Sequence, residues 1–156
     1  MRVLMLTQFY APITGGEERH VQDLSLALAA RGHHVAVATL AYDSCPAYEV
    51  DRGIHVHRLG GTLQRASWLF KEAQRRHVPP LPDPEFTWKL RQLIAREQPD
   101  IIHAHNWLVY SFLPLKRWSR AKLIVTLHDY SLQCAKKRLM YGGQPCSGPR
   151  PGKCLS

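Results

Sequence analysis

The chain has 156 residues, enough for one domain with a substantial hydrophobic core. Hydrophobic residues make up 45% and charged residues 21%, as in an ordinary globular protein, and no apolar run is long enough to span a membrane. The start, MRVLMLTQFY, lacks the long apolar segment and small-residue cleavage site of a secretory signal. We therefore expect a cytoplasmic location.

The net charge is +9 with histidines neutral, and it is unevenly distributed. After Asp100 the only acidic residue is Asp129, whereas basic residues are frequent there: Lys116, Arg117, Arg120, Lys122, Lys136, Lys137, Arg138, Arg150 and Lys153. Such a basic surface suits phosphates, anionic lipid or nucleic acid. The alternative is an ordinary solvated face whose acidic partners lie elsewhere in the protein.

The chain opens with a strand and a helix joined by a glycine turn. Residues 3–9 are apolar, as in a buried strand, and Gly15 and Gly16 precede a stretch with apolar residues at helical spacing, Val21, Leu24 and Leu28. A helix that begins after glycines can direct free backbone N–H groups at an anion. Alternatively, the glycines only form a tight turn, since neither G-x-G-x-x-G nor G-x-x-x-x-G-K-[ST] is present.

Both ends of this first helix carry capping signals. Thr14 and Glu17 have the spacing of a capping box, in which each side chain bonds a free backbone N–H of the other residue. Gly32 follows the helix where a left-handed residue is favoured. We therefore expect the helix to start beside the glycines and to end before Gly32.

Strand and helix patterns alternate along the rest of the chain. Further strands are expected at 33–40, 54–59, 100–105 and 122–128; helices at 68–76 and 84–96, the latter capped by Asp83; a mixed apolar segment at 106–118; and irregular loops at 42–53 and 77–84. Because the strands read as continuous apolar runs, the pattern predicts an α/β fold with a doubly wound, Rossmann-like parallel sheet. Right-handed crossovers give the strand order 3-2-1-4-5.

The end of the chain differs in composition from the rest. Residues 131–156 are rich in Gly, Pro, Lys and Cys and have no periodicity, so we expect a domain at 1–130 and an irregular tail at 131–156, cut before a second domain. A zinc site formed by Cys134, Cys146 and Cys154 would be one ligand short, and unpaired thiols are the alternative.

Polar residues stand at the predicted ends of three strands. In an open parallel sheet, ligands bind beyond the carboxyl ends of the strands, where the strand order reverses. The expected topology brings three groups to this edge: Gly15 and Gly16 after the first strand, His103, His105 and Asn106 at the fourth, and His128 with Asp129 at the fifth. The H-x-H pair also begins some metal-hydrolase signatures, but Trp107 and Leu108 replace the residues that would follow, so no metal site is predicted.

The opening stretch resembles the N-terminal domain of glycosyltransferase family 4, whose retaining enzymes have the GT-B fold. The residues that carry the resemblance are Tyr10, Pro12, Gly15, Gly16, Leu28, Arg31, Gly32, His33 and Val35. The segments QPDIIHAHNW and TLHDY are also similar to that family, so the resemblance extends from Met1 to about Tyr130.

The resemblance implies the acceptor-side half of a two-domain enzyme that transfers a sugar from a nucleotide-sugar donor to a glycan or lipid-linked acceptor. It places Gly15 and Gly16 near the donor diphosphate, His128 near the donor sugar with Asp129 beside it, and Glu17, His103, His105 and Asn106 on the acceptor side. The donor-binding C-terminal domain, with its E-x7-E pair, is expected as a partner. No cofactor or metal is implied beyond the nucleotide-sugar co-substrate, and transfer by these residues alone is uncertain.

The resemblance also implies a place for the positive charge. Many members use lipid-linked acceptors, so basic segments at Arg75–Arg76 and 116–122 would suit a peripheral position at an anionic membrane.

Two other functions compete with glycosyl transfer. A dehydrogenase half is disfavoured because Leu40-Ala41-Tyr42 stands where an acid would bind ribose, and a non-catalytic anion- or nucleic-acid-binding module rests on charge alone and lacks a known nucleic-acid motif.

Overall fold

The structure is a computed structural model that describes residues 1–42, 45–62, 81–130, 134, 139–148, 150 and 154. The chain divides into two compact units, Met1–Thr126 and Leu127–Ser156. The expected helix at 68–76 and the loop residues 77–80 lie outside the described part. No described helix has the length and apolar character needed to cross a membrane.

The first unit is built on a six-stranded sheet of order β3-β4-β2-β1-β5-β6. The strands are β1 Arg2–Leu6, β2 His34–Leu40, β3 Tyr48–Asp51, β4 Ile54–Leu59, β5 Ile101–His105 and β6 Lys122–Thr126. All neighbouring pairs are parallel except β3 and β4, which form an antiparallel hairpin. The five strands expected from the sequence therefore stand in the predicted order, which confirms the Rossmann-like fold class.

The hairpin strand β3 is the detail in which the sheet differs from the prediction, since the sequence indicated only a loop at 42–53. Its four residues alternate between exposed and half-buried, so they give no apolar run. The turn to β4 has left-handed backbone at Arg52 (φ 49°) and Gly53 (φ 84°), the geometry that suits a two-residue hairpin. A short edge strand of this kind is specified mainly by its turn.

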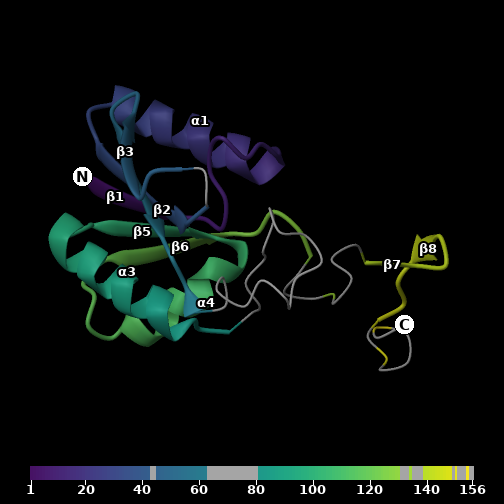
Figure 1. Ribbon diagram of the computed structural model, residues 1–156. Coiled ribbons are helices and arrows are strands. Elements are labelled where there is room, and N and C mark those ends of the chain that lie inside the picture. Colours follow the sequence, from purple (N-terminus) through teal and green to yellow (C-terminus); the bar gives the residue numbers. More distant parts are fainter. Residues whose placement is uncertain are drawn as a thin grey trace. The chain divides into compact units, whose positions relative to one another are not determined.

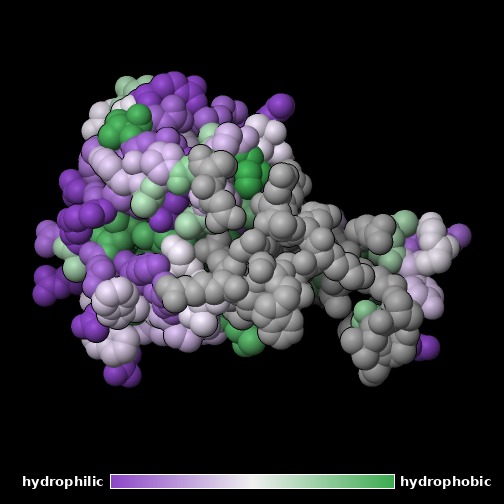
Figure 2. Space-filling view, viewed as in Figure 1, coloured by the Kyte–Doolittle hydropathy of each residue, from purple (hydrophilic) through white to green (hydrophobic). Residues whose placement is uncertain are grey.

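Helices cover both faces of the sheet (Figure 1). Helix α1, Gly16–Ala30, lies on one face, and helices α3, Pro84–Glu97, and α4, Val109–Phe112, lie on the other, with short 3₁₀ turns at η2, Asn106–Leu108, and η3, Leu113–Leu115. Each face has its own apolar cluster, one with Met5, Val21 and Val37 and the other with Leu6, Phe86 and Leu90. Strand β1 contributes to both clusters and is buried on both sides. The outward side of α1 is covered by hydrophilic residues (Figure 2).

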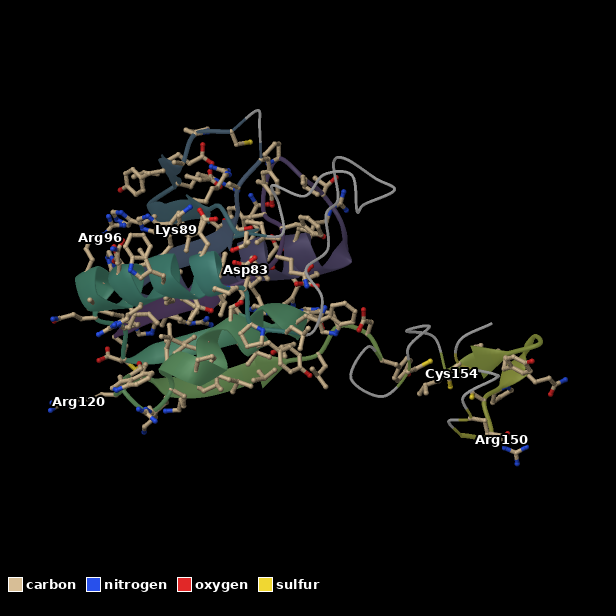
Figure 3. The ribbon with its side chains drawn as sticks, turned by 60° about the horizontal axis from the view of Figure 1, so that its bottom comes forward. Asp83, Lys89, Arg96, Arg120, Arg150 and Cys154 are labelled. Atoms are coloured by element: carbon tan, nitrogen blue, oxygen red, sulfur yellow. The ribbon has the colours of Figure 1, made fainter. Side chains whose placement is uncertain are left out.

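Two of the three predicted capping signals are confirmed. The Asp83 carboxylate accepts a hydrogen bond from the backbone N–H of Phe86 at 3.0 Å and so caps α3 (Figure 3). Gly32 has a φ of 80° and closes α1 through a bond from its N–H to the Ala29 carbonyl. The predicted capping box between Thr14 and Glu17 was wrong. The N-cap residue of α1 is Gly15, which makes no side-chain cap, and the Glu17 carboxylate bonds Thr7 and Asn106 instead.

The second unit contains a small hairpin of its own. Strands β7, Met140–Tyr141, and β8, Gln144–Pro145, pair antiparallel across a turn in which Gly142 and Gly143 have left-handed backbone. The expectation of a wholly irregular tail is thus corrected at this point. Among the described residues the cysteines form no disulfide, and the Cys146 thiol lies 3.5 Å from the Gly148 carbonyl.

A charged cluster at the amino ends of the strands centres on Glu97. Its carboxylate accepts a hydrogen bond from Arg2 at 3.1 Å, lies 2.9 Å from His34 Nε2 and lies 3.6 Å from His57 Nε2. Burial alone would raise the pKa of Glu97, but the hydrogen bond from His34 and the charges of His34 and Arg2 lower it. This carboxylate therefore stays ionised inside the fold.

Buried His57 is held in its neutral form. Arg96 Nη2 lies 3.0 Å from His57 Nδ1, and because a guanidinium only donates, this nitrogen is the acceptor and carries no proton. Burial, followed by the charge of Arg96, lowers the pKa of His57 to about 4, although Glu97 acts in the opposite direction. An unfolded chain binds this proton near pH 6.5.

The free energy of unfolding should therefore fall as the pH is lowered from about 6.5 to about 4, by up to about 3 kcal/mol from this group. Urea unfolding at a series of pH values measures the effect. His57→Gln should flatten the curve in this window, whereas the control His33→Gln should keep the wild-type slope. An unchanged slope in His57→Gln would show that another group causes the pH dependence.

Candidate functional site

The switch point of the sheet lies at the carboxyl ends of β1 and β5, and we call the edge around these two strand ends the crevice. Strand β1 lies between β2 and β5, and the connection after β1 passes through α1 on one face whereas the connection after β5 passes through α4 on the other. The two connections therefore diverge from neighbouring strands, which is where open α/β sheets bind ligands.

Glu17 bridges this crevice from the first turn of α1. Its Oε2 accepts a hydrogen bond of 2.6 Å from Asn106 Nδ2 beyond β5, and its Oε1 lies 3.1 Å from the Thr7 hydroxyl beyond β1. Asn106 is buried and has a left-handed backbone (φ 51°), a conformation that asparagine tolerates better than most residues. The structure thus brings together Glu17 and Asn106, which are far apart in the sequence but were expected at one edge.

The expected histidine pair continues the crevice along β5. His103 and His105 point to the α1 face of the sheet with ring centroids 4.4 Å apart, and the His20 ring of α1 lies 6.0 Å from that of His105. His105 is fully buried, while His103 is half-buried and its Nε2 lies 2.7 Å from the Thr126 hydroxyl of β6. Carboxylate, amide, hydroxyl and imidazole groups together can exchange hydrogen bonds with a polyhydroxylated ligand.

The glycine loop, residues 7–15, is tied down at its middle by Tyr42. The Tyr42 hydroxyl accepts from the backbone N–H of Tyr10 at 2.9 Å and lies 3.5 Å from the Gln8 carbonyl, while its ring stacks on Phe9. Burial raises the pKa of Tyr42, and burial followed by the charge of Asp51 raises that of Tyr10 to about 12. Both phenols remain protonated at neutral pH.

The two glycines at the start of α1, the N-cap Gly15 and the first helical residue Gly16, differ in the space around their backbone. A methyl group added to Gly16 would meet none of the described residues within 4 Å, so these residues leave the space beside its backbone open. A methyl group on Gly15 would instead collide with the carboxylate of Glu18. The backbone at Gly16 is therefore the part of this helix start that a ligand can approach closely.

The predicted catalytic pair belongs to the second unit. His128 and Asp129 lie in a bend and are both half-buried. Strand β6 ends at Thr126, so the expected strand at 122–128 is two residues shorter and the pair follows it as loop.

A family model described as "Glycosyl transferase 4-like domain" matches residues 15–151. The chain belongs to this family. It is 29% identical over 141 residues to an uncharacterized glycosyltransferase of Methanocaldococcus jannaschii, covering 83% of the chain and 31% of that protein. It is 28% identical over 145 residues to a glycogen synthase of Mycobacterium tuberculosis, covering 82% of the chain and 33% of that protein.

Solved structures support the same fold for this glycosyl transferase 4-like domain. Sucrose-phosphate synthase from Thermosynechococcus elongatus superposes with a TM-score of 0.64 at 18% identity, covering 96% of this chain and 37% of that one. The catalytic domain of starch synthase IV from Arabidopsis thaliana, bound to ADP and acarbose, gives 0.61 at 19% identity, covering 97% and 39%. The fold is one half of a GT-B architecture, and the chain spans about a third of the length of these relatives.

The sequence analysis missed several residues of this glycosyltransferase domain that shape the crevice. His20 and Thr126 flank the histidine pair, and Tyr42 and Arg58 hold the glycine loop. Only Arg58 gave a usable signal, because an arginine stood where the strand pattern required an inward apolar residue. The others are common residue types whose partners come from distant strands.

We expect Glu17 and Asn106 to be energetically coupled. In a double-mutant cycle with Glu17→Ala and Asn106→Ala, the coupling free energy should be about 1–2 kcal/mol. Either single substitution already removes the charged, partly buried hydrogen bond, so the second substitution cannot remove it again. Urea unfolding of the four proteins measures it. The neighbouring Glu18→Ala, paired with Asn106→Ala, should show a coupling near zero, and equal coupling for both glutamates would contradict the bridge.

Proposed function

We propose that this chain is the acceptor-side domain of a retaining glycosyltransferase, which moves a sugar from a nucleotide-sugar donor to a glycan or lipid-linked acceptor. The observation that carries the proposal is the Glu17–Asn106 bridge across the crevice of a family-4-like fold. It gathers hydrogen-bonding groups that suit sugar hydroxyls at the edge where such sheets bind ligands. The donor nucleotide is held by a second domain with the E-x7-E pair.

In this proposal the two sides of the crevice have different tasks. The amides at Gly15 and Gly16 approach the donor diphosphate from across the interdomain cleft, where the helix dipole adds to the attraction. Glu17, His103, His105 and Asn106 line the acceptor side. The exposed backbone of Gly16 supports the first task, and the polar bridge supports the second.

His128 and Asp129 are the proposed catalytic residues. An imidazole at the end of the last strand would hydrogen-bond the donor sugar and stabilise the charge that develops as the diphosphate leaves. Asp129 would orient that imidazole or contact the acceptor. Configuration at the anomeric carbon is retained, as is typical of the family that the sequence resembles.

Turnover by the full-length protein tests the proposal. Release of nucleoside diphosphate from UDP-, GDP- and ADP-sugars should be detectable, and the anomeric signal of the product in an NMR spectrum should match that of the donor. His128→Ala should lower kcat about 100-fold because one transition-state hydrogen bond is lost. The control His33→Ala should retain the wild-type rate; equal rates in His128→Ala would remove His128 from the mechanism.

The non-catalytic alternative is an anion- or nucleic-acid-binding module. The family match favours glycosyl transfer instead. Glu17 and Glu18 in the first turn of α1 weaken anion binding by this chain alone, whereas a donor diphosphate would also contact the second domain. Absence of donor turnover together with steeply salt-dependent binding of duplex would support this alternative.

We also propose that the chain approaches an anionic membrane surface with the corner around η3. Trp118 is 64% exposed with the Arg117 guanidinium 4.1 Å from its ring centroid, and Leu113 is also exposed.

Basic side chains surround these apolar groups. Lys116, Arg120 and Lys122 are exposed, and no acidic residue occurs between 101 and 128. Arg120 points away from the body of the domain (Figure 3). Exposed tryptophan with clustered lysine and arginine is the pattern of interfacial binding. Arg75 and Arg76 lie outside the described residues.

Vesicle sedimentation tests the membrane proposal. The protein should bind phosphatidylcholine vesicles that contain phosphatidylserine and lose binding in high salt. Trp118→Ala should weaken binding about tenfold because its ring no longer inserts at the interface. Val50→Ala, which truncates an exposed side chain on the opposite edge strand β3, is the control. Equal binding to vesicles without phosphatidylserine would contradict the proposal.

A further inference from the structure

A buried arginine stands at the carboxyl end of β4. Along this strand Ile54 and Val56 point into the apolar cluster beneath α1, and Arg58 is the next residue on the same face. Its side chain is only 1% exposed. A guanidinium at such a position needs a specific reason, because burying a charge is costly.

The guanidinium of Arg58 joins two loops. Its Nη2 donates to the Ala11 carbonyl of the glycine loop at 2.7 Å and to the Glu49 carboxylate at 2.5 Å, and its Nη1 donates to the Pro46 carbonyl at 3.1 Å. Among the described residues its Nε has no hydrogen-bond partner. The guanidinium is thus held by its two terminal nitrogens, and one of them reaches the loop before Gly15.

Fold stability alone does not explain this arrangement. A buried ion pair is often no more stabilising than apolar residues of the same volume. Here Glu49 is 37% exposed, and Arg58 Nε has no partner among the described residues. What the arginine provides is geometry, because its planar fork fixes the direction of each bond.

We propose that Arg58 is a positioning residue that holds the glycine loop in the conformation which presents the Gly15 and Gly16 amides to the donor diphosphate. Arg58 fixes the Ala11 carbonyl, and Tyr42 fixes the adjacent N–H of Tyr10. A turn with the Ile13 N–H bonded to the Tyr10 carbonyl connects this anchor toward α1. Pre-ordering of the loop lowers the entropic cost of binding. The inference rests on the proposed function of these glycines.

Hydrogen exchange tests the anchor without any assumption about activity. In the full-length protein, Arg58→Lys keeps the charge but loses the fork, so amides within residues 10–16 should exchange about tenfold faster while those of α3 stay unchanged. Glu49→Gln removes the charge that pairs with the guanidinium and should give a smaller increase. Arg91→Lys, an exposed arginine on α3, is the matched control. Wild-type loop exchange in both Arg58→Lys and Glu49→Gln would overturn the proposal.

Kinetics separate positioning from a purely structural role. Arg58→Lys should raise the KM for the nucleotide-sugar about tenfold, while kcat and the KM for the acceptor stay nearly unchanged. The thermal midpoint of unfolding should also stay at the wild-type value. A purely structural role would lower the active fraction, and hence kcat, with no change in donor KM; that result would overturn the proposal.

Gly16→Ala distinguishes failure of this inference from failure of the proposed function. Its added methyl group meets none of the described residues but would stand where a phosphate approaches, so it should raise the donor KM. If Gly16→Ala raises the donor KM and Arg58→Lys does not, the positioning role is wrong. If neither raises it although Arg58→Lys loosens the loop, the assignment of the loop to the diphosphate is wrong.

Discussion

The central strand β1 is buried on both faces, and this constraint decides where polar groups can lie. Leu4, Met5 and Leu6 are inaccessible to solvent, so the chain has no room for functional side chains until the strand ends. The neighbouring strand β5 is also buried on the face covered by α3, but it carries His103 and His105 on the face covered by α1. The two connections leave toward opposite faces, and the groups just beyond the strand ends therefore meet in one crevice.

The crevice is more acidic than a phosphate site needs to be. Glu17 bonds Asn106 and faces Thr7, and the Glu18 carboxylate lies against Gly15, so two carboxylates already interact with the positive end of α1. Neutral sugar hydroxyls can donate to such carboxylates, whereas a diphosphate would rely on the glycine amides at this helix start. In the proposed reaction, cationic groups for the leaving diphosphate would come from the second domain, in keeping with the proposed acceptor-side role of this half.

The sequence predicted correctly those features that depend on neighbouring residues in the chain, namely most strands and two helix ends. Apolar runs located the parallel strands, Asp83 and Gly32 located helix ends, and topology rules gave the strand order. The failures involve tertiary partners. The Thr14–Glu17 spacing suggested a cap, but a bond to Asn106 across the crevice satisfies Glu17 instead. The left-handed backbone of Asn106 and the partners of His103 depend on strands far away in the sequence, so no window of residues contains them.

Tyr42 gives a physical reason to expect that a dinucleotide binds this otherwise similar fold poorly. A dinucleotide-binding sheet places a carboxylate near the end of the second strand, where it accepts hydrogen bonds from the ribose. Here the Tyr42 hydroxyl is committed to the Tyr10 N–H and its ring to Phe9. Arg58 closes the same side by bonding Ala11. Among the described residues, the β2 and β4 side of this edge therefore carries the two loop anchors, whereas the amide and imidazole groups lie on the β5 side.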